Sequence, residues 1–236
     1  MTPFYLSFNV SPFRLSGVVY AALLNHALQL AALGDAVNQP PYKAPPKAPV
    51  LAVKPRHTLA RHGDAVVVPA GHTALVVGAS LGLVMGRTAC RVPAASALDF
   101  VAGYTVANEL SLPLSSHYRP SVRLMARDGF CPIGTDDNDG TGGLHVTPAV
   151  RVRAPDALPV TVHIDGGLAW QGSTGGRVRG VAQLIADVTE FMTLQPGDVL
   201  LLGVAAEAPL ARAGQDVRIT IEGIGTLSNR LIAEAP

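Results

Sequence analysis

The segment 100–134 constrains the fold of this chain most, because an apolar β-type run there leads directly into the densest cluster of charge. Val101, Tyr104 and Val106 predict a buried strand. Glu109 follows where the apolar run ends, and a carboxylate at a strand end is a candidate site residue. The segment therefore predicts a β-rich core with a polar site at the end of one of its strands.

Arginines recur beyond this strand at every fourth position, at Arg119, Arg123 and Arg127, so a helix or a strand would present all three on one face. Guanidinium groups on one face suit an anion, because each can donate two hydrogen bonds to a carboxylate. The alternative is a solvated basic edge balanced by Asp128, where each ion pair contributes little. Residue chemistry alone leaves both interpretations open.

The composition fits a globular chain with a full core, because hydrophobic residues make up 48% of the 236 residues and charged residues only 15%. We expect one domain over 1–236, with 1–16 as an N-terminal extension. The net charge of +1 gives no field that would attract nucleic acid or a membrane. The N-terminus lacks signal-peptide features and the longest apolar run is too short to span a membrane, so a cytoplasmic location is expected.

Two cysteines, Cys90 and Cys131, lie far apart, and neither has a second cysteine or a histidine at metal-ligand spacing. Both are therefore predicted to be reduced, buried thiols. The polar run 135–143 contains three aspartates but lacks the spacing and terminal glutamate of an EF-hand. We expect a polar loop there.

Short apolar runs separated by glycine and proline predict a mainly β fold with a few helices, an α+β class. Strands are predicted over 18–24, 50–54, 64–69, 75–85, 146–153, 160–164 and 216–221, with another after the turn at 196–198. Residues 165–167, Asp-Gly-Gly, predict a hairpin turn. An amphipathic helix is predicted over 180–191, and shorter helical segments over 25–33, closed by Gly34, and over 94–101.

Several motifs, spread over almost the whole chain, resemble the fumarylacetoacetate hydrolase family. They are YKAPPKAPVLAVKP (42–55), LGLVMGRTACRV (81–92), VAGYTVANELS (101–111), YRPSVRLMARDGFCPIG (118–134), FMTLQPGDVLLLG (191–203) and IEGIGTLSN (221–229). The resemblance implies the mixed β-sheet roll of that family. Within it, YKAPPK and DGFCPIG are most similar to the N-terminal half, or separate first subunit, of the bifunctional isomerases/decarboxylases of 4-hydroxyphenylacetate (homoprotocatechuate) catabolism.

The resemblance implies a Mg²⁺ or Mn²⁺ ion that chelates a 2-oxo acid and stabilises an enolate, so it needs hard oxygen ligands. The family supplies them as E-x-E and an aspartate. The E-x-E positions fall on Gly78 and Ser80 here, and the aspartate position falls on Glu109. Two of the three ligands are missing, so this chain is not expected to bind the ion itself.

Other family positions have lost their chemistry. The H-x-x-E pair of active members matches Gln29 and Ala32, neither of which is an acid or base near neutral pH. A family lysine is replaced by Met125, and the T-G-T-P stretch that meets substrate is replaced by Leu-Gly-Val-Ala at 202–205. These changes suit a pocket that was filled with apolar groups. No catalytic residue is therefore assigned to this chain.

Four other positions still match the family pattern: Tyr118, Arg119, Arg127 and Asp128. They are candidates for binding a small dicarboxylate or 2-oxo acid. Ion pairs that hold a subunit interface would use the same residues, so both roles stay open.

Two functional hypotheses follow. In the first, the chain is a subunit of a 2-hydroxyhepta-2,4-diene-1,7-dioate isomerase and 5-oxopent-3-ene-1,2,5-tricarboxylate decarboxylase, inactive alone, whose working metal site lies on a homologous partner. In the second, it is a non-catalytic family member that binds an anion or scaffolds an assembly. A self-sufficient hydrolase would need the E-x-E and H-x-x-E groups. Both hypotheses predict a partner or self-association.

Overall fold

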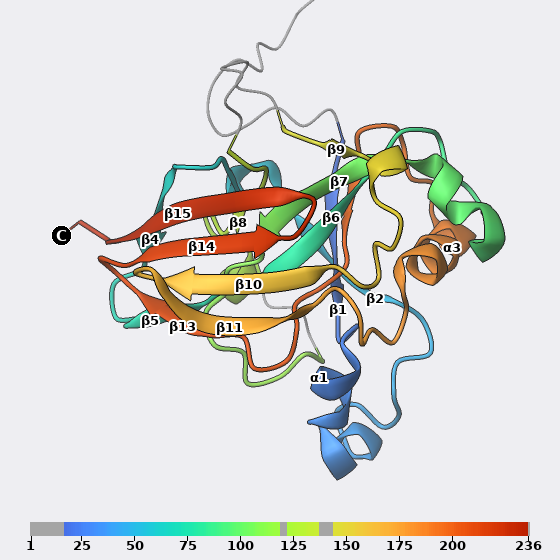
Figure 1. The fold of residues 1–236 in the computed structure, drawn as a ribbon. Helices are drawn as coiled ribbons and strands as arrows, with labels where there is room; N and C mark the ends of the chain where they lie inside the picture. Colours follow the sequence, from blue (N-terminus) through green and yellow to red (C-terminus); the bar gives the residue numbers. More distant parts are fainter. Residues whose placement is uncertain (1–16, 119–121, 137–143, 236) are drawn as a thin grey trace, which may run out of the picture.

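The computed structural model describes residues 17–118, 122–136 and 144–235, and its main elements are two large β-sheets that pack against each other (Figure 1). The first sheet has the strand order β2-β1-β12-β6-β7-β9. Its strands are β1 (Val19–Leu23), β2 (Val50–Lys54), β6 (Ala79–Met85), β7 (Val101–Asn108), β9 (Thr147–Pro148) and β12 (Val199–Leu201).

The second sheet has the order β11-β10-β14-β15-β4. Its strands are β4 (Ala65–Val68), β10 (Pro159–Ile164), β11 (Gly167–Ser173), β14 (Asp216–Ile221) and β15 (Gly225–Ala233). Two small sheets pair β5 (Ala74–Val76) with β13 (Leu210–Arg212), and β3 (Leu59–Ala60) with β8 (Cys131–Pro132). Because β1 runs parallel to β12 and antiparallel to β2, and β15 runs parallel to β4, both large sheets are mixed. The predicted fold class is confirmed.

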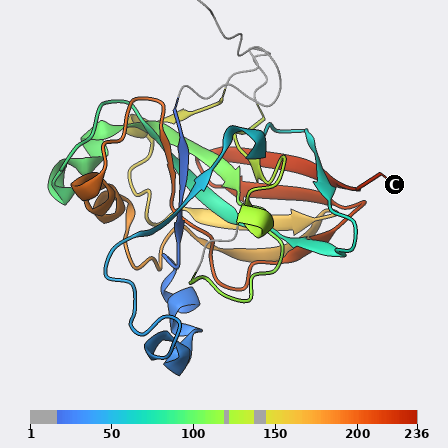
Figure 2. The same ribbon diagram turned by 180° about the vertical axis from the view of Figure 1, so that it is seen from behind.

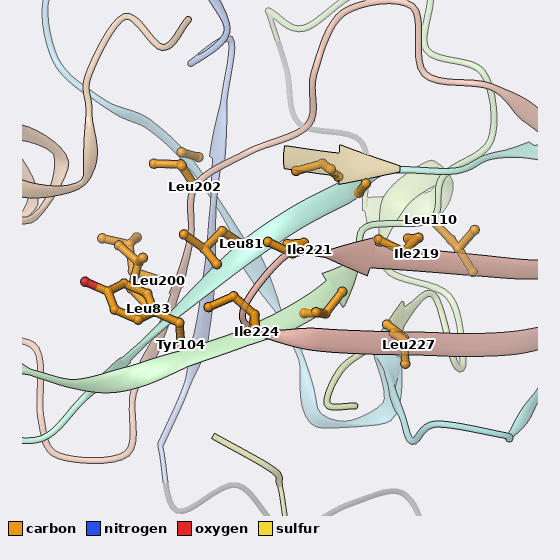
Figure 3. Close-up of a cluster of buried hydrophobic side chains, with 14 of the residues drawn as sticks. Leu81, Leu83, Tyr104, Leu110, Leu200, Leu202, Ile219, Ile221, Ile224 and Leu227 are labelled. Carbon is orange, nitrogen blue, oxygen red and sulfur yellow. The ribbon is translucent and has the colours of Figure 1, made fainter. Parts of the chain in front are cut away.

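The hydrophobic core lies between the two large sheets, as Figure 3 shows. Leu81 and Leu83 of β6 and Tyr104 of β7 belong to one cluster with Ile219 and Ile221 of β14. All residues of β6 are buried, because this central strand is covered on both faces. Full burial of one such leucine or isoleucine stabilises the fold by roughly 1.5–3 kcal/mol. This core holds β7 rigidly, and Glu109 follows the end of β7.

Helix α3 (Val181–Phe191) covers one end of the sheets and buries Val181, Leu184, Ile185 and Val188, which confirms the predicted amphipathic helix. The remaining helical segments are short: α1 (Ala27–Ala31), α2 (Val122–Met125), and the 3-10 turns η1 (Gly34–Asn38), η2 (Arg56–Thr58), η3 (Ala94–Phe100) and η4 (Ala149–Arg151). α1 and η1 project away from the sheets in both views (Figures 1 and 2). No described helix is long and apolar enough to cross a membrane.

The hairpin prediction is confirmed. β10 and β11 are joined by Asp165 and Gly166, both with positive φ, at 50° and 79°. Two central residues of positive φ define a type I′ turn, whose twist matches that of the two strands. The local sequence was sufficient here, because Asp and Gly readily adopt the positive φ that such a turn requires.

The segment 75–85 is not one strand, as predicted, but two strands in different sheets. β5 ends at Val76 and β6 begins at Ala79. Between them the Gly78 N–H donates to the Asn108 side-chain oxygen over 3.0 Å, which removes that group from the regular ladder. A side-chain amide thus replaces a strand partner, and the break places Gly78 against the end of β7.

The strand predicted over 146–153 is also wrong in most of its length. Within 146–153 only β9 is a strand, because Pro148 has no N–H to donate to a ladder, and η4 follows immediately. Val150, expected to alternate inward, has 92% of its surface exposed. The apolar alternation in this segment therefore belongs to a turn.

The first helix is shorter than predicted, and Gly34 does not close it. α1 begins only at Ala27, because the buried Asn25 amide donates to the carbonyls of Arg179 and Leu202, each over 3.0 Å. Gly34, with φ of 49°, begins the separate 3-10 turn η1. Asn25 thus fixes the end of β1 instead of capping a helix.

The two cysteines differ in burial. Cys131 is buried in β8, as predicted, whereas Cys90 is exposed, which corrects the prediction. The neighbouring Ala89 is buried and pairs with Leu194. Successive side chains of extended backbone point to opposite sides, so Cys90 points to solvent. Both thiols are free. The predicted extension 1–16 and most of the polar run 135–143 lie outside the described residues.

Candidate functional site

A cavity of about 550 Å³ lies between the end of β1 with α1, the segment that follows β7, and the loop 204–208. It brings together five positions at which the family resemblance assigned chemistry: Gln29, Ala32, Glu109, Met125 and Val204. These residues are far apart in the sequence, and the two sheets place them around one space. The cavity is therefore the candidate functional site.

Glu109 is the most unusual residue of this site. It follows the last residue of β7 and is 3% exposed, and among the described residues no donor lies within ordinary hydrogen-bond distance of either carboxylate oxygen. The Lys54 ammonium at the end of β2 lies 4.0 Å from Glu109 Oε2, with both side chains almost completely buried. Lys54 Nζ also lies 3.5 Å from the Met125 carbonyl oxygen. The carboxylate is thus balanced in charge but not hydrogen-bonded.

Burial raises the pKa of the Glu109 carboxyl above its ordinary value, because the ionised form loses its water shell. The Lys54 ammonium, the nearby Ser80 hydroxyl and the Arg177 guanidinium act in the opposite direction, and burial outweighs them. Arg177 is itself largely buried, which lowers its pKa to about 10, and its Nη1 donates to the Gly203 carbonyl over 3.0 Å. The Lys54 and Arg177 cations therefore both favour the ionised form of one buried carboxylate.

Gly78 and Ser80, the other two positions that the resemblance predicts as metal positions, carry no carboxylate. Gly78 lies so close to the end of β7 that an added Cβ would be 2.5 Å from the Glu109 carbonyl oxygen and 2.7 Å from Val204 Cγ2. Ser80 is 2% exposed, and its hydroxyl accepts the Gly203 N–H over 3.1 Å. There is no room at Gly78 for a longer side chain unless backbone moves.

The residues present therefore do not fit a Mg²⁺ or Mn²⁺ ion. Within the described part of the chain, no group of three or more His, Cys, Asp or Glu residues could hold a metal. Such an ion takes several oxygen ligands, and Glu109 offers one carboxylate that already faces an ammonium group. No reaction step through a metal on this chain follows from the geometry.

His117 and the residues around it shape the cavity wall. The His117 backbone N–H donates to the Tyr42 hydroxyl over 2.8 Å, and that hydroxyl lies 3.1 Å from Ser116 Oγ. The rings of Tyr42 and Tyr118 meet edge to face at 5.9 Å. Tyr42 belongs to the proline-rich segment 39–49, so this loop anchors the wall. Burial lowers the pKa of His117, which favours the neutral imidazole.

Three of the four predicted anion-binding residues, Tyr118, Arg127 and Asp128, do not line this cavity. Tyr118 is 48% exposed and contacts Tyr42, and Asp128 is exposed. Arg127 Nε donates to the Arg123 carbonyl over 2.9 Å. None of these residues lines the cavity, and Arg119 lies outside the described residues. Their role in binding a substrate or an interface stays a prediction.

Sequence reasoning missed Lys54, His117 and Arg177. Lys54 carried a usable signal, because it ends the apolar run of β2 in the same way that Glu109 follows β7. A charged residue at the end of a buried strand is a candidate for a buried pair. His117 and Arg177 carried no comparable signal, because loops place them.

Comparison with known proteins finds relatives along nearly the whole chain. Residues 18–232 match the family model described as fumarylacetoacetate (FAA) hydrolase, C-terminal. A 4-hydroxyphenylacetate degradation bifunctional isomerase/decarboxylase of Salmonella dublin is 40% identical over 220 residues, which cover 93% of this chain and 48% of that protein. The chain thus spans about half the length of the curated relatives of this kind that it matches.

Solved structures share the fold. A 5-carboxymethyl-2-hydroxymuconate delta-isomerase from Mycobacterium smegmatis matches with a TM-score of 0.72 and 25% identity, over 94% of this chain and 81% of that one. A fumarylpyruvate hydrolase from Pseudomonas aeruginosa, solved with Mn²⁺ and pyruvate, matches with a TM-score of 0.75 and 21% identity, over 92% and 90% of the two chains. The second likeness concerns the fold alone.

Proposed function

The chain belongs to the fumarylacetoacetate hydrolase family, and from this premise we propose that it is one subunit, or one half, of an isomerase and decarboxylase of 4-hydroxyphenylacetate catabolism. The substrates of the complex are 2-hydroxyhepta-2,4-diene-1,7-dioate and 5-oxopent-3-ene-1,2,5-tricarboxylate. A homologous partner holds the Mg²⁺ or Mn²⁺ ion, and this chain contributes no catalytic residue.

The observation that carries this proposal is the cavity around Glu109. Five residues to which the resemblance assigns chemistry line it: Gln29, Ala32, Glu109, Met125 and Val204. Glu109 carries the single carboxylate among the three predicted metal positions, and it faces Lys54. Gln29 and Ala32 lack acid and base groups, so these two positions cannot transfer a proton. The bifunctional relatives are about twice as long as the match, which leaves room in them for a second half.

The role of this chain in the complex is structural. Its fold rests on apolar core clusters and paired strands, which would not be disturbed by the loss of metal ligands. Members of this family resemble pairs of similar halves. Two such halves bury an interface between them. This chain would hold its partner in the active arrangement through such an interface.

The test mixes the purified chain with a homologous polypeptide that carries intact E-x-E and H-x-x-E groups, in Mg²⁺ or Mn²⁺. The chain alone should show no decarboxylation or isomerisation, and the mixture should exceed the partner alone. Replacing both glutamates of the partner's E-x-E motif with glutamine should abolish turnover by the mixture. Turnover by this chain alone, with contaminating enzyme removed, would contradict the proposal.

The second candidate is a scaffolding family member without any catalytic complex. The incomplete metal site is equally compatible with it. The two functions differ in one outcome of the same experiment, because a scaffold would associate with a partner and leave its rate unchanged. Binding of the metal-bearing homologue without a change in its turnover would favour the scaffold.

A further inference from the structure

We propose that the cavity beside Glu109 is a binding site for a small uncharged molecule with a mainly apolar body, instead of a dicarboxylate. This inference goes beyond the proposed function, because it concerns a ligand of this chain and requires neither a metal nor a partner. It rests on the size of the cavity, on its lining and on the placement of charge around it.

The size and lining of the cavity suit a compact apolar ligand. Its volume of about 550 Å³ lies in the range of small-molecule sites, roughly 300–1,000 Å³. Most lining side chains are aliphatic, among them Leu28, Val76, Leu114, Val204 and Ala208. A ligand that transfers apolar surface from water into this space gains free energy in proportion to the area buried.

The charges around the cavity disfavour an anion. The described lining includes the carboxyl groups of Glu109 and Glu207 and no lysine or arginine. Lys54 stands behind Glu109, and Arg177 is engaged with backbone carbonyls, so neither is offered to the cavity. Among the described lining residues, a carboxylate that enters this space would find no opposite charge to replace its lost water shell, which is costly.

The same arrangement gives a cation little advantage. The Glu109 charge is already balanced by the Lys54 ammonium at 4.0 Å. Glu207 is exposed, so water screens it. An organic ammonium group would therefore lose its hydration without meeting an unbalanced buried carboxylate.

Uncharged polar groups complete the lining. Gln29 contributes an amide, Ser111 a hydroxyl and His117 an imidazole, and each can both donate and accept a hydrogen bond. The imidazole belongs with the uncharged groups, because burial lowers the pKa of His117. They suit a hydroxyl or amide on the ligand and set its orientation. Apolar surface with a few neutral polar groups is typical of small-molecule sites.

The experiment uses three probes with the same ring and different charge: benzyl alcohol, benzoate and benzylamine. Calorimetric titration of the full-length chain near neutral pH measures each dissociation constant, and ligand-observed NMR confirms contact. Benzyl alcohol should bind at least about tenfold more tightly than either charged probe. Tightest binding of benzoate or of benzylamine would overturn the proposal, as would no saturable binding of any of the three.

Variants locate the site. Val204→Phe should fill the cavity and abolish benzyl alcohol binding, and Ala32→Phe, at an exposed lining position, should do the same where Val204→Phe disturbs folding. Val150→Phe is the matched control, because Val150 is 92% exposed and lies outside the cavity. Unchanged binding in both cavity variants would overturn the assignment. These experiments measure binding by this chain alone, so a negative result would leave the proposed function of the complex intact.

Discussion

The pair Lys54–Glu109 defines the site at the scale of single residues. Its Nζ–Oε2 distance is 4.0 Å and both side chains are almost fully buried, whereas Glu109 lacks hydrogen bonds. Attraction in a buried pair offsets the loss of hydration only in part, but removal of one partner leaves an uncompensated charge. Removal of one of the two residues is therefore expected to destabilise the fold more than replacement of both by apolar residues.

We expect Lys54→Met to lower the free energy of unfolding by about 3–5 kcal/mol, because it leaves the Glu109 carboxylate buried without a cation. The double variant Lys54→Met with Glu109→Leu should recover most of this loss, since it removes both charges. Urea denaturation measures the effect, and Lys47→Met at an exposed position is the control. An equal loss in the single and double variants would contradict the coupling.

The raised pKa of Glu109 predicts a pH dependence of stability. The folded state holds the Glu109 proton to higher pH than the unfolded state, so unfolding releases a proton in this range. Stability from this group is therefore present below its ordinary pKa of 4.5 and is lost as pH rises through the raised value. Glu109→Gln should flatten the fall in urea midpoint with pH, and an unchanged slope would contradict the assignment.

The two thiols should differ in reactivity. Burial raises the pKa of Cys131 to about 12, and its side chain has 0% exposure, whereas Cys90 is exposed. Because the thiolate is the reactive form, a disulfide reagent should label Cys90 in the native protein and Cys131 only after unfolding. Cys90→Ser should abolish the native signal. Rapid native labelling in Cys90→Ser would show that Cys131 is accessible.

At the scale of elements, the break between β5 and β6 decides the shape of the site. The glycine at this break, Gly78, donates its N–H to the Asn108 side chain and accepts the Glu109 N–H over 2.8 Å. The backbone after β7 thereby lies directly against Gly78. This close approach fills the space that a carboxylate at position 78 would need.

Gly78→Ala should destabilise the protein by about 1–3 kcal/mol, because its Cβ would meet the Glu109 carbonyl oxygen at 2.5 Å. Gly167→Ala is the matched control, since a Cβ there would find its nearest neighbour at an ordinary 3.5 Å. Thermal and urea unfolding measure both variants. Equal stability of the two variants would show that the backbone at Gly78 moves at little cost in free energy. A metal titration of Gly78→Glu would then be the next experiment.

At the scale of the whole molecule, large apolar side chains remain on the surface. Leu28 is 66% exposed, Val53 54%, Val122 72% and Phe191 60%, and β2, which carries Val53, forms one edge of the first sheet. Exposed apolar surface and an open strand edge both favour association. This surface is available for the association that we propose.

Sedimentation velocity at micromolar concentration should therefore detect an assembly larger than the monomer, formed either by this chain alone or with a homologous chain. The reason is the apolar surface that association would remove from water. The titration should include the metal-bearing homologue. A strict monomer that also fails to bind this homologue would contradict the expectation.

Local chemistry made much of the fold predictable. The helix at 181–191 follows from its apolar spacing, the hairpin at Asp165 and Gly166 from its turn residues, and the end of β7 from its apolar run. Each depends on interactions between neighbours in the chain. The prediction failed at 75–85 and 146–153, where the Asn108 side chain and Pro148 interrupt ladders that the apolar pattern implied.

The sequence by itself determined the family and the mixed β fold, because the motifs that carry them are visible residue by residue. The assignment of Gly78 and Ser80 to lost ligand positions stays a prediction. Only the tertiary structure decided that Lys54 meets Glu109 and that the backbone after β7 occupies the space beside Gly78. Burial, charge pairing and cavity shape arise from segments distant in sequence, and no local pattern encodes the distance between them.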